Sequence, residues 1–169
     1  MPAEKVQFAG RYLTLTTEEK GTVVYERVYS RNGVTVIVEP SPGVLRFVNG
    51  TRWDEPENLL PLVVSAYLED GEDPLSCAKR ELLEELGATA TQWSHYLTSR
   101  WKGTVIKTQE YFLAREITQG VARPNADEDI RGYVDLTFDE VKRAVLELTF
   151  GTNENAFALL KYITEIESS

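Results

Sequence analysis

Short runs of apolar and β-branched residues, separated by turn residues, occupy much of the first seventy positions and predict strands. They lie at Thr22–Tyr29, Val34–Glu39, Val44–Val48 and Leu59–Leu68. The segment Arg31–Gly33 has the composition of a tight turn, so the first two runs are expected to form a hairpin. Pro61 interrupts the last run, because proline has no N–H to contribute to a sheet.

The same pattern continues in the second half of the chain. Three further strands are predicted at Trp93–Thr98, Glu110–Ile117 and Gly132–Leu136. A turn at Lys102–Gly103 separates the first two, and an acidic loop, Pro124–Asp129, precedes the third. Strands therefore dominate the chain up to about residue 136.

Two helices are predicted at the end of the chain. Thr137 and Glu140 have the spacing of a capping box, which predicts a helix over Phe138–Leu148. Thr152 or Asn153 is expected to cap a last helix, in which apolar residues recur at helical spacing. These residues are Phe157, Leu160 and Ile163.

A third helix lies in the middle of the chain, and its start and end are both marked. Asp73 is a good N-cap, Pro74 suits the first helical position and Gly87 suits the position after the last turn. One apolar stripe, spaced three and four residues apart, marks the face toward the core. It consists of Leu75, Ala78, Leu82 and Leu86.

Strands first, one helix in the middle and helices last predict an α+β fold, with a mixed sheet packed between helices and antiparallel strands at the N-terminus. At 169 residues, without repeats or linkers, the chain is expected to form one domain. No apolar run approaches a membrane span and no signal peptide is recognisable, so a cytoplasmic location is expected. The single cysteine, Cys77, excludes an internal disulfide and a multi-cysteine zinc site. The net charge of −9 argues against a nucleic-acid-binding protein.

The middle helix carries three acidic residues that share a second face, since Glu81, Glu84 and Glu85 stand at positions i, i+3 and i+4. Like charges at these spacings repel, and the helix dipole disfavours anions near the C-terminal end. A bound cation would offset both the repulsion and the unfavourable helix dipole, and Mg²⁺ prefers carboxylate oxygens. The alternative is an acidic face exposed only to solvent.

The segment around these glutamates resembles the signature of the Nudix hydrolases, G-x5-E-x7-R-E-U-x-E-E-x-G-U, in which U is apolar. The residues in register are Glu72, Arg80, Glu81, Leu82, Glu84, Glu85, Gly87 and Ala88. Two positions depart from the pattern of the family. The first glycine is replaced by Ala66, whose backbone carbonyl can still face a metal ion. Leu62–Ala66 also lacks the glutamate that is usual just upstream in relatives that cleave ADP-ribose.

Outside the signature, the chain is similar to the branch of the family that hydrolyses ADP-ribose and nucleotide sugars. Arg52 falls where that branch often has an arginine that contacts the substrate; an ordinary surface arginine is the alternative. The segment Asp127–Arg131 resembles a loop that supplies a carboxylate as general base or as a further metal ligand. Glu128 is the first candidate and Asp127 the second, and a solvated acidic loop is the alternative.

The resemblance implies a Mg²⁺-dependent pyrophosphatase, with Mn²⁺ as a substitute ion. Glu81, Glu84 and Glu85 would hold the ions together with the Ala66 carbonyl, and Arg80 would orient one of the carboxylates. Alternative substrates are GDP-mannose, dinucleotides and nucleoside triphosphates. A binding or regulatory module with weak activity is the alternative from another class. The resemblance also implies a homodimer, to which the strands in residues 1–40 would contribute.

Overall fold

The computed structural model describes residues 4–52, 55–124, 129–147, 149 and 153–169. The strands are β1 (Lys5–Ala9), β2 (Leu13–Lys20), β3 (Val23–Ser30), β4 (Gly33–Ser41), β5 (Val44–Arg52), β6 (Glu55–Leu62), β7 (Val64–Tyr67), β8 (Ala88–Trp101), β9 (Val105–Gln119) and β10 (Ile130–Thr137). The helices are α1 (Pro74–Leu86), α2 (Phe138–Leu146) and α3 (Asn153–Glu167). No helix in these ranges is long and apolar enough to span a membrane.

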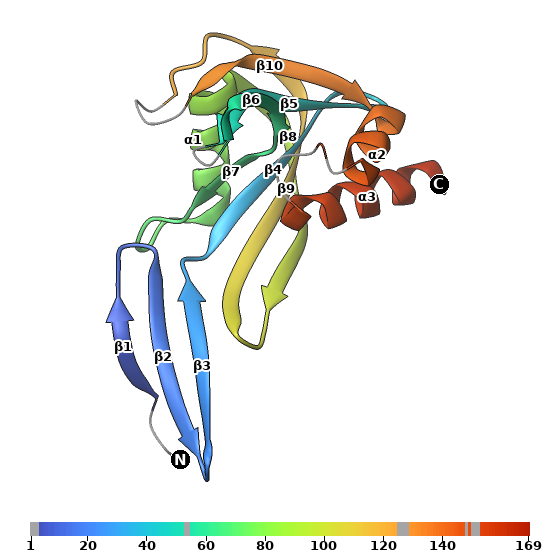
Figure 1. Cartoon of the computed structure of the whole chain (residues 1–169). Coiled ribbons are helices and arrows are strands. Elements are labelled where there is room, and N and C mark those ends of the chain that lie inside the picture. Colours follow the sequence, from blue (N-terminus) through green and yellow to red (C-terminus); the bar gives the residue numbers. More distant parts are fainter. Residues whose placement is uncertain (1–3, 53–54, 125–128, 148, 150–152) are drawn as a thin grey trace.

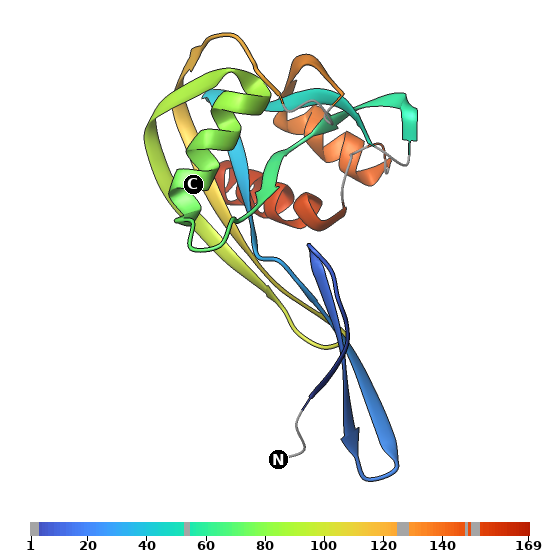
Figure 2. The same cartoon turned by 90° about the vertical axis from the view of Figure 1, so that its left-hand side faces the viewer.

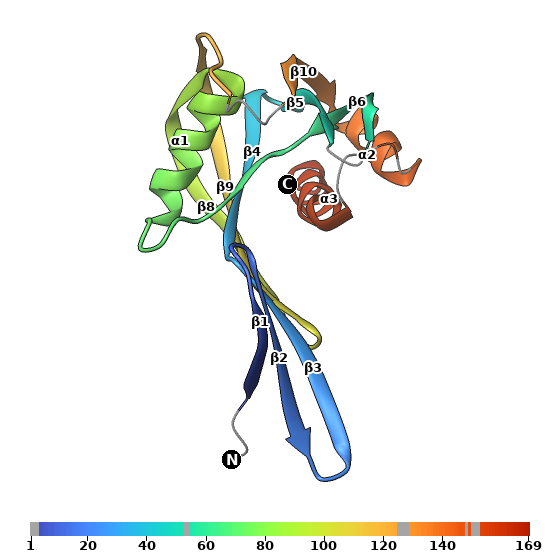
Figure 3. The ribbon, with the colours of Figure 1, turned by 60° about the vertical axis from the view of Figure 1, so that its left-hand side comes forward.

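The centre of the molecule is a mixed sheet built around β4 and β9, which run parallel from Gly33↔Gln109 to Val38↔Ala114. β7 and β5 pair antiparallel with β4, β8 pairs antiparallel with β9, and β6 and β10 both pair with β5. Figures 1 and 3 show α1 on one face of this sheet and α2 and α3 on the other. The predicted α+β arrangement is therefore confirmed.

Two apolar cores result from the alternation of side chains along the central strands. Val34, Val36 and Val38 of β4 face α1 and pack with its stripe, whereas Ile37 faces the other way and packs with α2 and α3. Because both faces are covered, β4 is buried almost throughout its length.

The three N-terminal strands form an arm that extends away from this body (Figure 2). β1 pairs with β2 and β2 with β3, and β3 meets the body in a short parallel pairing with β9, Val28↔Val105 and Tyr29↔Ile106. The predicted hairpin between Thr22–Tyr29 and Val34–Glu39 is therefore wrong. The chain bends at residues 31–32, and both strands then lie parallel to β9 at different points along it.

The other predicted boundaries differ less from the structure. The run Leu59–Leu68 is divided into β6 and β7, with the break at Val63 rather than at Pro61, which lies inside β6 opposite Asn49. The helix predicted over Phe138–Leu148 ends at Leu146 and has the expected capping box between Thr137 and Glu140. Thr152, one of the two predicted caps of the last helix, lies outside the described residues, and α3 begins at Asn153.

Candidate active site

The local sequence fixes both ends of α1. The Asp73 side chain accepts a hydrogen bond from the Ser76 N–H at 2.9 Å, and Pro74 occupies the first turn. Gly87 ends the helix with a φ of 62°, in the left-handed region that glycine adopts without strain. Ala78, Leu82 and Leu86 are buried against the sheet as predicted. The remaining faces of this helix carry the charged residues.

Glu81 and Glu85 lie together on a face that is almost fully buried, with exposed fractions of 5% and 8%. Buried carboxylates are rare unless other groups compensate their charge, because burial removes the hydration of the anion. The side chain of Glu84 is more exposed, at 31%. The alternative of a purely solvated acidic face is therefore wrong for Glu81 and Glu85.

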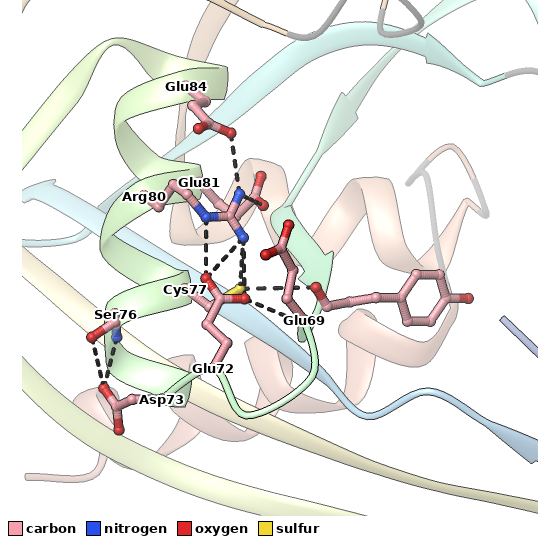
Figure 4. Close-up of polar contacts among 9 residues, drawn as sticks. Glu69, Glu72, Asp73, Ser76, Cys77, Arg80, Glu81 and Glu84 are labelled. Carbon is pink, nitrogen blue, oxygen red and sulfur yellow. Dashed lines mark hydrogen bonds and ion pairs between the residues drawn. The ribbon is translucent and has the colours of Figure 1, made fainter. Parts of the chain in front are cut away.

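The guanidinium of Arg80 is the centre of an ionic cluster that we call the Arg80 cluster: Glu72, Arg80, Glu81 and Glu84 (Figure 4). Nη1 of Arg80 donates to Glu81 at 2.5 Å and to Glu84 at 3.2 Å. Nε and Nη2 both donate to Oε1 of Glu72 at 3.1 Å. The expected pairing of Arg80 with a carboxylate of the signature is present, and it involves three carboxylates rather than one.

These contacts shift the ionisation of the cluster. Burial pushes the pKa of Glu72 upward, but hydrogen bonds from the Glu69 N–H and from Arg80 outweigh it, and the pKa lies below the usual value of 4.5. Burial also opposes the charged form of Arg80, yet the nearby Glu81 and Glu72 carboxylates raise its pKa. Glu72 and Arg80 are thus both charged near neutral pH.

Cys77 lies next to the cluster and is buried. Its Sγ accepts a hydrogen bond from Nη2 of Arg80 at 3.4 Å and contacts the Tyr67 carbonyl at 4.0 Å. Burial, together with the charge of Glu72, raises the pKa of the thiol to about 12, so Cys77 is protonated and packs as a small apolar residue.

The carboxylates of α1 and the backbone carbonyl of Ala66 are oxygen ligands of the kind that a hard divalent cation prefers. Ala66 of β7 is paired with Val34 and packs against the core cluster that contains Cys77, Ala78 and Leu82 of α1. Among the described residues, however, no three His, Cys, Asp or Glu side chains converge as a metal site. Instead, the positive charge beside Glu81 and Glu84 is supplied by Arg80.

The other candidates belong to other segments of the chain than α1 and β7. Arg52 is half-buried at the end of β5, next to Thr51, which bonds Asp129 through both its N–H and its hydroxyl, each at 3.1 Å. Arg52 therefore lies beside the end of the acidic loop. Glu128 and Asp127 fall outside the described residues. The sequence did not predict two groups that support the site. The Glu69 N–H donates a hydrogen bond to Glu72 at 3.0 Å, and the segment 120–123 forms backbone hydrogen bonds with the C-terminal end of α1.

Comparison with solved structures places this architecture among known folds. The crystal structure of an ADP compounds hydrolase superposes with a TM-score of 0.75 at 16% sequence identity, over 97% of this chain and 92% of that one. A structure of MutT, from work on Aliivibrio salmonicida and Vibrio cholerae, gives a TM-score of 0.60 at 14% identity, over 79% of this chain and 97% of that one. At these identities, the likeness shows the fold alone.

Sequence comparison identifies the family. No curated protein sequence matches the chain. The sequence model of the NUDIX domain matches residues 30–156, which include the whole of the central sheet, α1 and the Arg80 cluster. The match covers most of the chain, and the signature residues lie in register on α1 and the turn before it. The protein therefore belongs to the Nudix family and is a Nudix hydrolase.

Proposed function

We propose that the protein is a Mg²⁺-dependent pyrophosphatase that hydrolyses ADP-ribose or a related nucleotide sugar to a nucleoside monophosphate and a sugar phosphate. The observation that carries the proposal is the pair of nearly buried carboxylates, Glu81 and Glu85, beside the Arg80 cluster. Anionic side chains buried on one helix face are the donors needed to bring divalent cations to a diphosphate.

The bound ions would be held by Glu81, Glu84 and Glu85 and by the carbonyl of Ala66. They would neutralise phosphate charge and lower the pKa of the attacking water. Mn²⁺ has similar oxygen preferences and is expected to substitute for Mg²⁺.

The chain's own residues have separate roles in this proposal. Arg80 holds Glu72 and keeps the signature carboxylates oriented, as its three ion pairs indicate. Glu84, the most exposed of the three helix carboxylates, is a catalytic carboxylate, and Glu128 of the acidic loop is the candidate general base. When a water oxygen bonds to one phosphorus, the bridging P–O bond breaks, and the proton of the water passes to the base.

The substrate class is supported by two observations. The solved structure with a TM-score of 0.75 is named as a hydrolase of ADP compounds, which favours an adenosine diphosphate derivative. Arg52 lies half-buried beside the acidic loop, and a guanidinium is a common partner of phosphate oxygens. GDP-mannose, dinucleotides and nucleoside triphosphates are the alternatives within the same reaction class.

A substrate panel tests the proposal. ADP-ribose, ADP-glucose, GDP-mannose, diadenosine diphosphate and ATP would each be incubated with the protein and Mg²⁺, and again with EDTA, and the products identified by ³¹P NMR. We expect AMP and ribose 5-phosphate from ADP-ribose, and no turnover with EDTA. Turnover of ATP and of no other compound would show that the substrates are nucleoside triphosphates. No turnover of any member would favour a binding module.

We also propose that the protein is a cytoplasmic homodimer of one domain, assembled through the N-terminal arm. The arm exposes apolar side chains that the body of the same chain does not cover. Among them are Val6 (58% exposed), Phe8 (60%) and Val24 (58%). Exposed apolar residues gathered on one part of a molecule commonly mark a protein interface, and a second copy of the arm offers a surface of the same kind.

A further inference from the structure

A pocket of about 200 Å³ lies where β4, β7 and β9 meet, close to the base of the arm. Its lining consists of Ser65, Ala66, Tyr67, Lys107 and Gln109. Ala66 is also the residue whose carbonyl is proposed to face a metal ion. The pocket therefore adjoins the proposed reaction centre, although it lies beside β7 rather than along α1.

A chain of buried hydrogen bonds fixes the orientation of Gln109, which is only 3% exposed. The hydroxyls of Thr35 and Tyr111 both donate to Oδ1 of Asn155, at 3.2 and 3.4 Å. Since the one hydroxyl hydrogen of Thr35 is used in this way, its oxygen accepts from Nε2 of Gln109 at 2.9 Å. The amide must then present Oε1 on its other side.

Oε1 of Gln109 has no hydrogen-bond partner. Among the described residues, it is the one buried side-chain nitrogen or oxygen atom without a partner. A buried acceptor without a donor is costly, so such an atom calls for an explanation. Gly33 allows a second acceptor to approach. A Cβ at this position would lie 2.6 Å from Oε1 of Gln109 and 2.7 Å from the Ala66 carbonyl oxygen. Two acceptors therefore lie near one point at the wall of the pocket.

From these contacts we propose that the pocket is a subsite for the sugar of the substrate, in which a sugar hydroxyl donates to Oε1 of Gln109. This inference rests on the proposed function. Lys107 in the lining disfavours a cationic ligand, so a neutral O–H donor fits better. A nucleobase is also disfavoured, because the ring of Tyr67 already stacks on Tyr12 at 5.3 Å and lies 5.5 Å from Nζ of Lys107.

The test compares two substrates of equal charge, ADP-ribose and the β-methyl ester of ADP, which has no sugar beyond the second phosphate. In Gln109→Leu, kcat/KM for ADP-ribose is expected to fall about tenfold, the effect of one hydrogen bond to a buried acceptor. For the methyl ester it is expected to stay within about twofold of the wild type. Gln92→Leu makes the same exchange at an exposed position of β8 and is expected to change neither value.

A second variant guards against a folding defect in Gln109→Leu. Ser65 is exposed and lines the pocket, so Ser65→Tyr fills the space without disturbing the core. It is expected to cause the same selective loss, with an unchanged melting temperature. Equal losses for both substrates, or no loss for either, would overturn the subsite while leaving the pyrophosphatase intact. If the wild type hydrolyses neither compound, the proposed function itself fails.

Discussion

Arg80 and Glu72 are joined by a fork of hydrogen bonds that ties the middle of α1 to the turn before it. Nη2 of Arg80 reaches both carboxylate oxygens of Glu72, at 3.1 and 3.3 Å, and Nε reaches one of them at 3.1 Å. The remaining nitrogen, Nη1, contacts Glu81 and Glu84. One planar side chain thus fixes the turn and two of the proposed metal ligands together.

Replacing Arg80 by lysine should separate these contacts, because an ammonium group cannot reach three carboxylates in the geometry of a guanidinium. We expect Arg80→Lys to lower kcat at least tenfold. The Arg80 side chain is 35% exposed, so solvent screens part of its ion pairs, and the unfolding free energy should fall by only about 1 kcal/mol. Urea denaturation and initial-rate measurements check the two values.

Arg31→Lys is the matched control for this exchange. Arg31 pairs with Asp70, which is 95% exposed, and neither residue belongs to the Arg80 cluster. Activity and stability should both stay close to the wild type. A similar loss in the two variants would mean that the fork to Glu72 has no special role.

The lowered pKa of Glu72 predicts how stability depends on pH. A carboxyl with a lower pKa in the folded state stabilises the fold above its unfolded-state pKa, and this contribution is lost as the pH falls through the folded-state value. The ordinary value is 4.5, so Glu72→Gln should be less stable than the wild type at pH 7. The difference should shrink as the pH falls below about 4.5, when measured by urea denaturation from pH 7 to pH 3. A difference that is constant over this range would contradict the ion pair.

Gly87 allows a close contact between the end of α1 and the segment that leads to the acidic loop, and a substitution there tests this contact. A Cβ there would lie 2.2 Å from backbone atoms of Val121 and Ala122, and φ is 62°. Gly87→Ala should therefore lose about 2–4 kcal/mol of unfolding free energy, from left-handed strain and overpacking together. Gly21 has a φ of 64° and open space around it, so Gly21→Ala should lose only about 1 kcal/mol. Equal losses at the two glycines would exclude the close contact.

The sequence predicts α1 well because its signals are local. The cap at Asp73, the apolar stripe and the glycine after Leu86 act within one helix, and the Nudix signature lies on the same stretch. Pairing between distant strands has no comparable local signal. The hairpin predicted around Arg31–Gly33 failed because β4 pairs with β9, more than seventy residues further along the chain.

The arm and the pocket also depend on contacts that the local sequence does not reveal. β1 alternates polar and apolar residues over Lys5–Phe8, which is a strand pattern, but it is exposed along its whole length. Nothing in the sequence shows that its apolar side chains face no core of their own chain. The hydrogen bonds that orient Gln109 join residues of β4, β9 and α3, and nothing in the sequence brings Thr35, Gln109 and Asn155 together. The residues of the signature are recognisable from sequence, whereas their surroundings require the fold.

The proposed metal ligands predict a linked effect on activity and stability. Glu84→Gln and Glu85→Gln should each lower kcat by two orders of magnitude or more, because each removes a carboxylate that is expected to hold an ion. Mg²⁺ should raise the melting temperature of the wild type, since an ion that binds only the folded state stabilises it, and should raise that of the variants less. Circular dichroism checks that both variants fold. Near-normal turnover in both would show that the ions are held elsewhere.

The exposed arm predicts that the assembly can be broken without damage to the body. Phe8 and Val24 are 60% and 58% exposed within one chain, so charges there should cost the isolated chain little. If the arms pack across a dimer, Phe8→Asp with Val24→Asp would bury two carboxylates in an apolar interface, and each would need to be desolvated. We expect the wild type to sediment as a dimer and the double variant as a monomer with an unchanged circular dichroism spectrum. Lys142→Asp is the charge-changing control and should remain dimeric, because it lies in α2, which is away from the arm (Figure 1). A wild type that is monomeric at all concentrations tested would rule out the arm-mediated dimer.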